Sequence, residues 1–424
     1  MGAVSKTRLR WCVGCVALLL AVSVSGCSTT TARSTASHRQ SGQGSAAPRV
    51  DLGGLTPGEI AVHIERLAAL TRQVLSVYVN RRRPSDPQYW ADGSFIARDA
   101  GIKCWYCYDT PATAAAVLSV QRDGDVGLRN IAIRTWTHAI RTYLRPSGEI
   151  VHGNGSNGVG TGFFAVQLGI TYLVLKPHLP AATRGLWAAA MTAMAKFLID
   201  SGALTFYING NVNLRQTEVM WLAWAISGQR RFYDDYLREY AFALTPTRPR
   251  WARYGLRIVA RRRAAAGADE AGYLTESSGD NPGFDPSYTL LQLDTATQLY
   301  VLTHDPRYVR LMNAELNQLR PLVNADYVLD ARGGSRQSNT IAFLTAAPFV
   351  LLISGVRPDL SQYWVGQLTA IHQQFVAAEG FANAGFYNGM SNWLGTAMLA
   401  VQYPAGILAP QCSPQRSPEC AALV

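Results

Sequence analysis

The chain has 424 residues, of which 48% are hydrophobic and 16% are charged, and its formal net charge at pH 7 is +11. This length excludes a small single module but is compatible with one large domain built from repeats. The positive charge suits an acidic polymer, an anionic envelope or nucleic acid as a partner, although a proteome rich in arginine would give the same charge.

The first 26 residues have the pattern of an export signal. Lys6, Arg8 and Arg10 precede the apolar run WCVGCVALLLAVSV, which is short for a transmembrane span. The stretch VSGC at 24–27 resembles the lipobox of bacterial lipoproteins, and this resemblance implies cleavage before Cys27 and a lipid on its thiol. An uncleaved anchor or a plain secretory signal is the alternative. Residues 27–52 lack core-forming side chains and are expected to form a flexible tether.

Export would place the protein in the bacterial cell envelope, anchored by its lipid to a membrane and facing the periplasm or the exterior. Nucleic acid is then the least suitable partner, and we expect none; we also expect a monomer. Disulfides are the default outside the cytoplasm. The simplest pairing is Cys104–Cys107 and Cys412–Cys420, with crossed pairs between the two groups as the alternative.

Helical periodicity dominates the rest of the chain. It predicts helices at about 56–80, 111–121, 127–144, 161–176, 181–201, 214–227, 230–244, 286–303, 306–323, 337–354, 360–378 and 390–401. These roughly twelve helices pair at the spacing of helical-hairpin repeats. We therefore predict one helical domain over 53–410, followed by a tail over 411–424.

Short and long connections alternate between these helices. The long ones cover 81–110, 145–160, 202–213, 245–285, 324–336 and 379–389. Antiparallel helices place successive turns at opposite ends, so all the long connections fall on one rim. Six such hairpins closed into a ring form an all-α (α/α)6 toroid, whose inner helices follow the long loops. An open helical solenoid is the alternative.

The long loops are rich in amides, aromatic residues and arginine. Planar amides hydrogen-bond sugar hydroxyls, aromatic faces stack on sugar rings, and arginine pairs with carboxylates. The glycines of 153–162 follow no predicted strand, so we interpret them as sugar-contacting backbone and not as a phosphate site. The predicted substrate-binding residues are Asn154, Asn157, Tyr207, Asn209, Asn211, Gln216, Asp280, Asp285, Tyr387, Asn388, Asn392 and Trp393.

Three motifs resemble those of the toroidal polysaccharide lyases that act on hyaluronate, chondroitin and xanthan. The stretch NLRQTE places Glu218 five residues after Asn213, as in the asparagine-led motif of that family. The segment GYLTESSGDNPGFDPSYT matches its glycine-aromatic loop, with Tyr288 as the family's tyrosine. The stretch RGGSR matches its arginine pair through Arg332 and Arg336. The resemblance covers about 200–420 and implies a toroid.

The resemblance also implies a β-elimination on a uronate-containing glycan. Asn213 would neutralise the substrate carboxylate so that the C5 proton becomes removable, and Tyr288 would act as acid or base. Arg332 or Arg336 would favour the phenolate or hold substrate carboxylates. This chain departs from the family in having no histidine between Tyr207 and Tyr300, where the catalytic histidine belongs. His152 lies on the same predicted rim and is the candidate substitute.

Two other functions compete with elimination. A glycoside hydrolase uses two carboxyl groups, and Glu218 or Glu276 would be the acid while Asp285 activates water; Asp280 is a further candidate. A glycan-binding lipoprotein would keep the groove without turnover. Each residue also has an ordinary structural explanation, such as Asn213 as a helix cap, Glu218 beside the helix dipole, or an Arg332–Asp330 ion pair. No cofactor or metal motif occurs, and we expect neither.

Overall fold

The computed structural model describes residues 56–79, 88–89, 95–96, 110–121, 125–152, 155–156, 158–245, 254–261, 270–278, 281–334, 340–377, 384–403 and 406–407. The predicted signal peptide, tether and tail lie outside these residues, as do Cys27, Cys104, Cys107, Cys412 and Cys420. The anchor, the disulfides and the domain boundaries therefore stay predictions.

Six helices form an inner ring. They are α3 (Thr110–Gln121), α5 (Gly158–Leu175), α7 (Gly210–Ser227), α9 (Pro286–Thr303), α11 (Ala347–Ile353) and α13 (Ala384–Gln402). Each packs against the next one in the chain, and α13 packs against α3. This last contact closes the ring and excludes an open solenoid.

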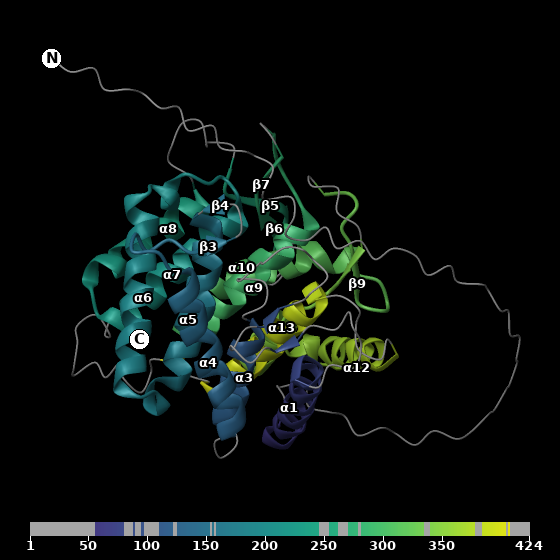
Figure 1. Cartoon of the computed structure of the whole chain (residues 1–424). Helices are drawn as coiled ribbons and strands as arrows, with labels where there is room; N and C mark the ends of the chain where they lie inside the picture. The colour runs from purple at the N-terminus through teal and green to yellow at the C-terminus, as the bar shows by residue number, and fades with distance from the viewer. Residues whose placement is uncertain are drawn as a thin grey trace, which may run out of the picture.

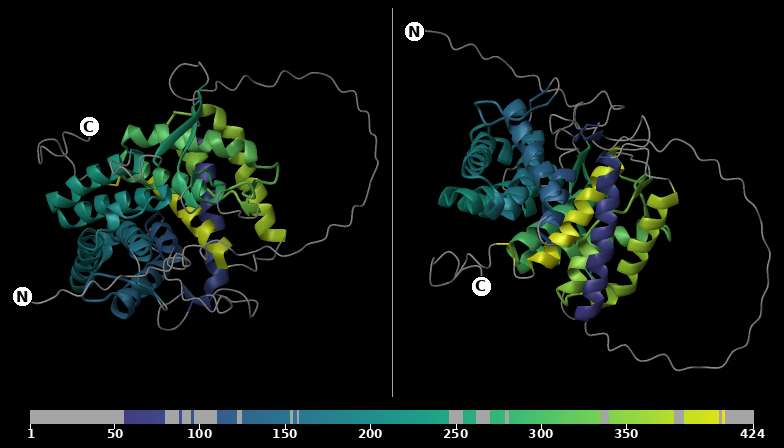
Figure 2. Two further views of the ribbon diagram at one scale, coloured as in Figure 1. Left: turned by 90° about the horizontal axis from the view of Figure 1, so that it is seen from above. Right: turned by 60° about the horizontal axis from the view of Figure 1, so that its bottom comes forward.

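Six further helices lie outside this ring. They are α1 (Pro57–Val79), α4 (Val126–Tyr143), α6 (Ala181–Asp200), α8 (Arg230–Leu244), α10 (Pro306–Leu319) and α12 (Ser361–Ala377). Each of the last five packs on the inner helix before it, while α1 lies beside α13, so the first and last described helices are neighbours (Figure 2). The described residues thus form an all-α (α/α)6 toroid, which confirms the predicted fold class.

The two layers differ in how their side chains are buried. The outer helix α8 repeats Phe232, Tyr236 and Tyr240 on its buried face at helical spacing and carries charged residues on the other face. The inner helix α5 is buried on every side. With the turn that follows it, it forms the one described helical segment, Gly158–His178, that is long and apolar enough to cross a membrane, and 94% of its 18-residue apolar window is buried inside the ring. A core helix of a closed ring meets that criterion without any membrane.

Short antiparallel hairpins occupy the long connections. Strands β1 (Gln88–Tyr89) and β2 (Phe95–Ile96) precede α3, and β3 (Val151–His152) and β4 (Gly155–Ser156) precede α5. The pairs β5 (Leu256–Arg261) with β6 (Glu270–Leu274) and β7 (Glu276–Ser278) with β8 (Asn281–Gly283) precede α9. The pair β9 (Val328–Asp330) and β10 (Thr340–Ala342) precedes α11. Every hairpin therefore lies in a connection that leads to the N-terminal end of an inner helix, and these ends form one rim of the ring (Figure 1).

Three predicted helix boundaries are wrong. Helix α7 begins at Gly210, so Asn213 lies within its first turns and is not the cap; Asn209 holds that position. Gly210 is required there because a Cβ would collide with Leu274, and its N–H donates to the Thr275 carbonyl oxygen. The helix predicted from residue 337 begins only at Ala347, because 340–342 pair with β9. Helix α13 begins at Ala384, earlier than predicted.

Candidate active site in the ring interior

At the rim, Glu276 connects the β-hairpins to two inner helices. One of its oxygens accepts hydrogen bonds from the Asn211 N–H at 2.9 Å and from Gln292 Nε2 at 2.7 Å, and the other accepts from Asn209 Nδ2 at 2.8 Å. Gln292 also bonds both backbone groups of Leu274. Since its two oxygens receive three donors, Glu276 holds the rim together and is a positioning residue.

Asp285 and Tyr288 lie at the start of α9. The Asp285 carboxylate accepts from the Tyr288 N–H at 3.1 Å and caps the helix, and both side chains are buried. Gly334 packs against this cap, since a Cβ there would lie 2.8 Å from an Asp285 carboxylate oxygen. The RGGS loop therefore reaches the N-terminus of α9, as the predicted convergence requires.

Arg332 in that loop is committed to Asp330. Its Nη2 lies 2.7 Å from Asp330 Oδ2 and its Nε lies 2.9 Å from Oδ1; Arg332 is exposed and Asp330 is half-buried. These hydrogen bonds lower the pKa of Asp330 to about 2. Arg332 therefore forms the ion pair with Asp330 that was the structural alternative to a catalytic role. Arg336 lies outside the described residues.

A second tier of polar side chains lies deeper in the ring, around Arg215. Its Nη1 donates to Glu218 Oε2 at 2.8 Å and to Gln298 Oε1 at 2.6 Å, and its guanidinium lies 5.1 Å from the centre of the Phe163 ring. Arg215 and Glu218 are both buried. Burying this ion pair removes water from both charged groups, and the attraction between them repays that loss of hydration only in part.

Glu218 and Asp294 both titrate near neutrality. Burial raises the pKa of Glu218 to about 7, against the opposing effect of Arg215. Burial likewise raises the pKa of Asp294 to about 7, opposed by hydrogen bonds from Thr345 and Asn392 and by the charge of Arg215. The two carboxyl groups, one on α7 and one on α9, therefore share one guanidinium as their common positive neighbour.

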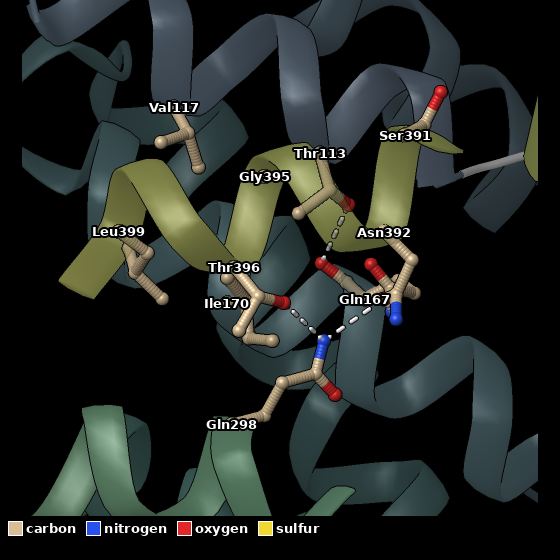
Figure 3. A pocket seen from close by; sticks show the side chains of 10 residues that line it. All are labelled: Thr113, Val117, Gln167, Ile170, Gln298, Ser391, Asn392, Gly395, Thr396 and Leu399. Atoms are coloured by element: carbon tan, nitrogen blue, oxygen red, sulfur yellow. Dashed lines mark hydrogen bonds between the residues drawn. The ribbon is translucent and has the colours of Figure 1, made fainter. Parts of the chain in front are cut away.

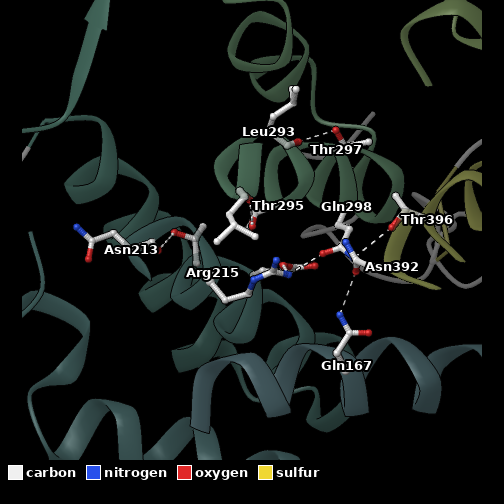
Figure 4. A network of polar contacts seen from close by, with 12 residues as sticks. Gln167, Asn213, Arg215, Leu293, Thr295, Thr297, Gln298, Asn392 and Thr396 are labelled. Atoms are coloured by element: carbon white, nitrogen blue, oxygen red, sulfur yellow. Dashed lines mark hydrogen bonds and ion pairs between the residues drawn. The ribbon is translucent and has the colours of Figure 1, made fainter. Parts of the chain in front are cut away.

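The network extends across the ring, from α7 through α9 to α13 and α5 (Figure 4). Gln298 Nε2 donates to Asn392 Oδ1 at 2.9 Å and to Thr396 Oγ1 at 3.1 Å, and Gln167 Nε2 donates to the same Asn392 oxygen at 3.3 Å. Four side chains of the inner tier lie eight or nine residues after the first residue of their helix: Gln167, Glu218, Asp294 and Asn392. At 1.5 Å per residue, that level is about 12 Å below the rim.

Glu315 stands behind this tier, on the outer helix α10. It is fully buried, and neither carboxyl oxygen has a hydrogen-bond partner. Burial raises the pKa of Glu315 well above its ordinary value, and the charges of Asp294 and Glu276 add to the shift. Glu315 therefore holds its proton to a higher pH than an exposed glutamate does, and it lies close enough to Asp294 and Glu276 for their charges to act on it.

A pocket adjoins the inner tier (Figure 3). It is a small space between α3, α5, α9 and α13, with room for about one water molecule. The residues lining it are Thr113, Val117, Gln167, Ile170, Gln298, Ser391, Asn392, Gly395, Thr396 and Leu399. Gln298 and Asn392 belong both to this pocket and to the network that holds Arg215 and Asp294. The pocket and the two carboxyl groups are thus parts of one site.

The predicted site residues divide between these levels. Asn211 and Asn213 lie in the first turns of α7, and each has a buried side-chain oxygen with no hydrogen-bond partner. Both side-chain amide atoms of Gln216 are also buried without a partner.

The other predicted site residues are either engaged in the fold or outside the description. The Tyr207 hydroxyl bonds backbone groups of Gly158 and Val159, and burial raises its pKa. Trp393 is fully buried, 5.7 Å from Trp364, so in this conformation it offers no face to a sugar. The side chains of His152, Asn154, Asn157, Asp280, Tyr387 and Asn388 lie outside the described residues.

The sequence-based predictions did not include Arg215, Asp294, Gln298, Gln167 or Glu315. A usable signal was present, because polar residues recur four positions apart in helices that are largely buried. Asp294 with Gln298 and Asn392 with Thr396 show that spacing, which places both members on one face. Among the described residues, no group of histidine, cysteine and acidic side chains could hold a metal ion.

Comparison with known proteins gives structural similarity alone. No protein-family model matches the chain, and no curated protein matches it in sequence. An unsaturated glucuronyl hydrolase from Streptococcus agalactiae superposes with a TM-score of 0.48 at 11% identity, covering 82% of this chain and 93% of that chain. A family 76 glycoside hydrolase (mannosidase) from Bacteroides thetaiotaomicron gives 0.44 at 9% identity, covering 80% of this chain and 99% of that one. Similarities at this level do not assign a function to the chain.

Proposed function

We propose that this protein is a glycan-cleaving enzyme that hydrolyses glycosidic bonds with Glu218 and Asp294. One observation carries the proposal: two carboxyl groups on neighbouring inner helices are buried beside the same arginine, and each has a pKa of about 7. Such values allow one group to be protonated while the other is ionised at neutral pH. That is the state in which a general acid and a general base act together.

In this reaction the protonated carboxyl group gives its proton to the glycosidic oxygen as the bond to the anomeric carbon breaks. The ionised group either removes a proton from the attacking water or attacks the anomeric carbon itself, depending on the separation of the two groups. Glu218 Oε1 has no hydrogen-bond partner, while Oε2 accepts a hydrogen bond from Arg215. The earlier candidate base, Asp285, caps α9 instead, and Asp294 takes its place in the proposal.

Elimination remains the second candidate, because of a specific feature of the rim. Asn213 has a buried amide oxygen without a partner near the start of α7, and Tyr288 lies near the start of the adjacent α9. An amide that faces a uronate carboxylate and a nearby phenol are the two groups that this reaction needs. Arg332, by contrast, is bound to Asp330, which removes one of the cations that would lower the tyrosine pKa.

One assay separates the candidates. Acidic polysaccharides and neutral glycans are incubated with the protein, and reducing ends and ultraviolet absorbance are measured on the same samples. Hydrolysis gives reducing ends without absorbance, whereas elimination gives both, because it forms an unsaturated uronate. An acidic polymer is the first choice of substrate, since the chain carries a formal charge of +11. Binding by calorimetry with neither product would reject both reactions and favour a glycan-binding protein.

The proposed location is the cell envelope, through a lipid on Cys27. This proposal rests on the VSGC stretch after the apolar run. Replacing Cys27 with serine should move the protein from the membrane fraction to the soluble fraction of the cell. Unchanged fractionation, together with no incorporation of labelled fatty acid in the unaltered protein, would contradict the lipid anchor.

A further inference from the structure

The hydrogen bonds that lead from Arg215 to α13 can run in only one direction. A guanidinium has donors and no acceptor, so the Gln298 oxygen at 2.6 Å from Arg215 Nη1 must accept. The Gln298 nitrogen is then left to face α13, where it donates to Asn392 Oδ1 at 2.9 Å (Figure 4). Gln167 Nε2 donates to the same oxygen at 3.3 Å. Because two donors occupy the Asn392 oxygen, the NH2 group of Asn392 is the part of its amide that donates to a further group.

Asp294 lies at the end of this chain of donors. Its carboxyl group is hydrogen-bonded to Thr345, just before α11, and to Asn392 on α13. The contact with Asn392 is a donation from Nδ2, because Oδ1 already accepts twice. The Thr345 oxygen accepts from the Ala347 N–H at 3.3 Å, which leaves its hydroxyl proton for Asp294. Both contacts therefore favour the ionised form of Asp294.

The same chain begins at Glu218. Arg215 Nη1, which donates to Gln298, also donates to Glu218 Oε2 at 2.8 Å. One continuous series of hydrogen bonds thus connects the two carboxyl groups of the proposed reaction. Each amide in it has its orientation set by the group before it, and Asn392 is the last of them.

The charged groups that act on Asp294 or respond to it are Arg215 on α7 and Glu315 on α10. Burial raises the pKa of Asp294 to about 7, and the Thr345 hydrogen bond, the charge of Arg215 and the Asn392 hydrogen bond oppose this shift. Burial, followed by the charge of Asp294, raises the pKa of Glu315. An ionised Asp294 therefore makes Glu315 keep its proton. Since burial opposes the charge on Asp294, each donor that faces this carboxyl group has a direct effect on its ionisation.

We infer that Asn392 is a positioning residue for the proposed reaction. Its amide is oriented by Arg215 through Gln298, and it keeps a donor on Asp294. Without that donor the buried carboxyl group would hold its proton to a higher pH, and the reaction would follow it there. This inference rests on the proposed function, because it concerns one of the two groups that are proposed to react.

The first test is a titration of both carboxyl groups in the complete protein, without substrate. Aspartate and glutamate are labelled with carbon-13 at the side-chain carboxyl group, and the two signals are assigned by their loss in Asp294→Asn and Glu218→Gln. We expect Asn392→Leu to raise the titration midpoint of Asp294 by about one pH unit, as for the loss of a hydrogen bond to a charged group. The midpoint of Glu218, which Asn392 does not contact directly, should move less.

Gln402→Leu is the matched control. It replaces another amide on α13, one whose nitrogen donates to the Val117 carbonyl oxygen at 2.8 Å, away from both carboxyl groups. It should leave both midpoints unchanged. Asn392→Ala removes the same donor without adding a branched side chain, and it takes the place of Asn392→Leu if that variant does not fold.

Double variants distinguish positioning from a general loss of packing. Gln298 acts through Asn392, so Gln298→Met should raise the midpoint of Asp294, and Gln298→Met with Asn392→Leu should raise it no further than Asn392→Leu alone. Thr345 donates to Asp294 independently. The effects of Thr345→Val and Asn392→Leu on the midpoint of Asp294 should therefore add.

The pH dependence of turnover is the second readout. On a glycan that the protein cleaves, Asn392→Leu should move one limb of the pH profile of kcat/KM up by the same amount, the acidic limb if Asp294 is the base and the alkaline limb if it is the acid.

Three results would overturn the inference. They are an unchanged Asp294 midpoint in Asn392→Leu, fully additive effects of Gln298→Met and Asn392→Leu, and a cleaved glycan for which neither limb of the profile moves. The third result would leave the proposed function standing. The expected midpoints without cleavage of any glycan would instead support the orientation of Asn392 and reject the proposed function.

Discussion

Glu276 at the rim and Glu218 in the ring interior are both fully buried, yet their surroundings are opposite. Glu276 receives three donors over its two oxygens, all from groups that connect the rim to α7 and α9. Glu218 receives only Arg215 on one oxygen, and its other oxygen has no partner. A buried polar atom without a partner is costly, so one that persists needs an explanation, and a catalytic role is one such explanation. The comparison separates a carboxylate whose two oxygens are satisfied by the protein from one that keeps an unsatisfied oxygen, as the proposed reaction requires.

The largest expected effect is on turnover. Glu218→Gln and Asp294→Asn should each lower the rate of reducing-end production by about 100-fold to 10,000-fold, because each removes a proton-transferring group. The amides keep the size of the side chains and one acceptor oxygen, so circular dichroism should show an intact helical fold.

Glu270→Gln is the control for these two variants. Glu270 pairs with Arg310 on the exterior, so its loss should leave turnover unchanged. Full activity in both Glu218→Gln and Asp294→Asn would contradict the proposed hydrolytic pair. If Asn213→Ala and Tyr288→Phe abolished an ultraviolet-absorbing product instead, elimination at the rim would be the reaction.

The next effect is on the pH dependence of stability. The pKa of Asp294 is about 7 in the folded protein and 3.8 ordinarily, so between these values the folded state keeps a proton that the unfolded chain has released. This stabilisation is therefore complete below about pH 4 and is lost as the pH rises toward 7. At about 1.4 kcal/mol per pH unit, Asp294 alone accounts for a loss on the order of 4 kcal/mol.

Urea denaturation at pH 5 and pH 8 measures the part of this loss that falls above pH 5, about 3 kcal/mol. The unaltered protein should be less stable at pH 8, and Asp294→Asn should lose less stability between these two values. Glu218, Glu239 and Glu315 also have raised pKa values, so the variant should retain part of the dependence. An identical pH dependence in the variant would show that Asp294 is not the buried, neutral-titrating group described above.

A smaller effect follows from the structural role of Glu276. Glu276→Gln replaces one acceptor oxygen by an NH2 group that faces the donors of Asn209, Asn211 or Gln292. The expected cost is about 2–3 kcal/mol in the free energy of unfolding, as for a broken hydrogen bond to a charged group. Turnover per folded molecule should stay near that of the unaltered protein. A loss of turnover as large as that of Glu218→Gln, without a loss of stability, would make Glu276 a catalytic residue.

The contrast between the rim and the ring interior also explains what the sequence could predict. Helix positions and the alternation of connection lengths are local properties, so the closed ring followed from them, and the predicted 286–303 coincides with α9. The residues at the rim could be predicted because the long loops are rich in amides, aromatic residues and arginine. Asp294 and Gln298 were not predicted, because the spacing of the polar residues in α9 does not reveal that this face points to the axis of the ring. Only closure of the ring brings Gln167, Arg215 and Asn392 to them.

The smallest expected effect is that of replacing Arg332 at the rim. Its guanidinium makes two contacts with Asp330 and is otherwise exposed, and exposed ion pairs of this kind contribute little to stability. Arg332→Ala should therefore leave thermal stability unchanged and turnover within about twofold of the unaltered protein, since a surface pair holds nothing else in place. The lyase resemblance requires the opposite, a large loss of turnover, because there the arginine supports the phenolate of Tyr288. Measuring Arg332→Ala and Arg332→Lys side by side decides the point: a loss in the alanine variant that lysine restores would return the chemistry to the rim and remove Glu218 and Asp294 from it.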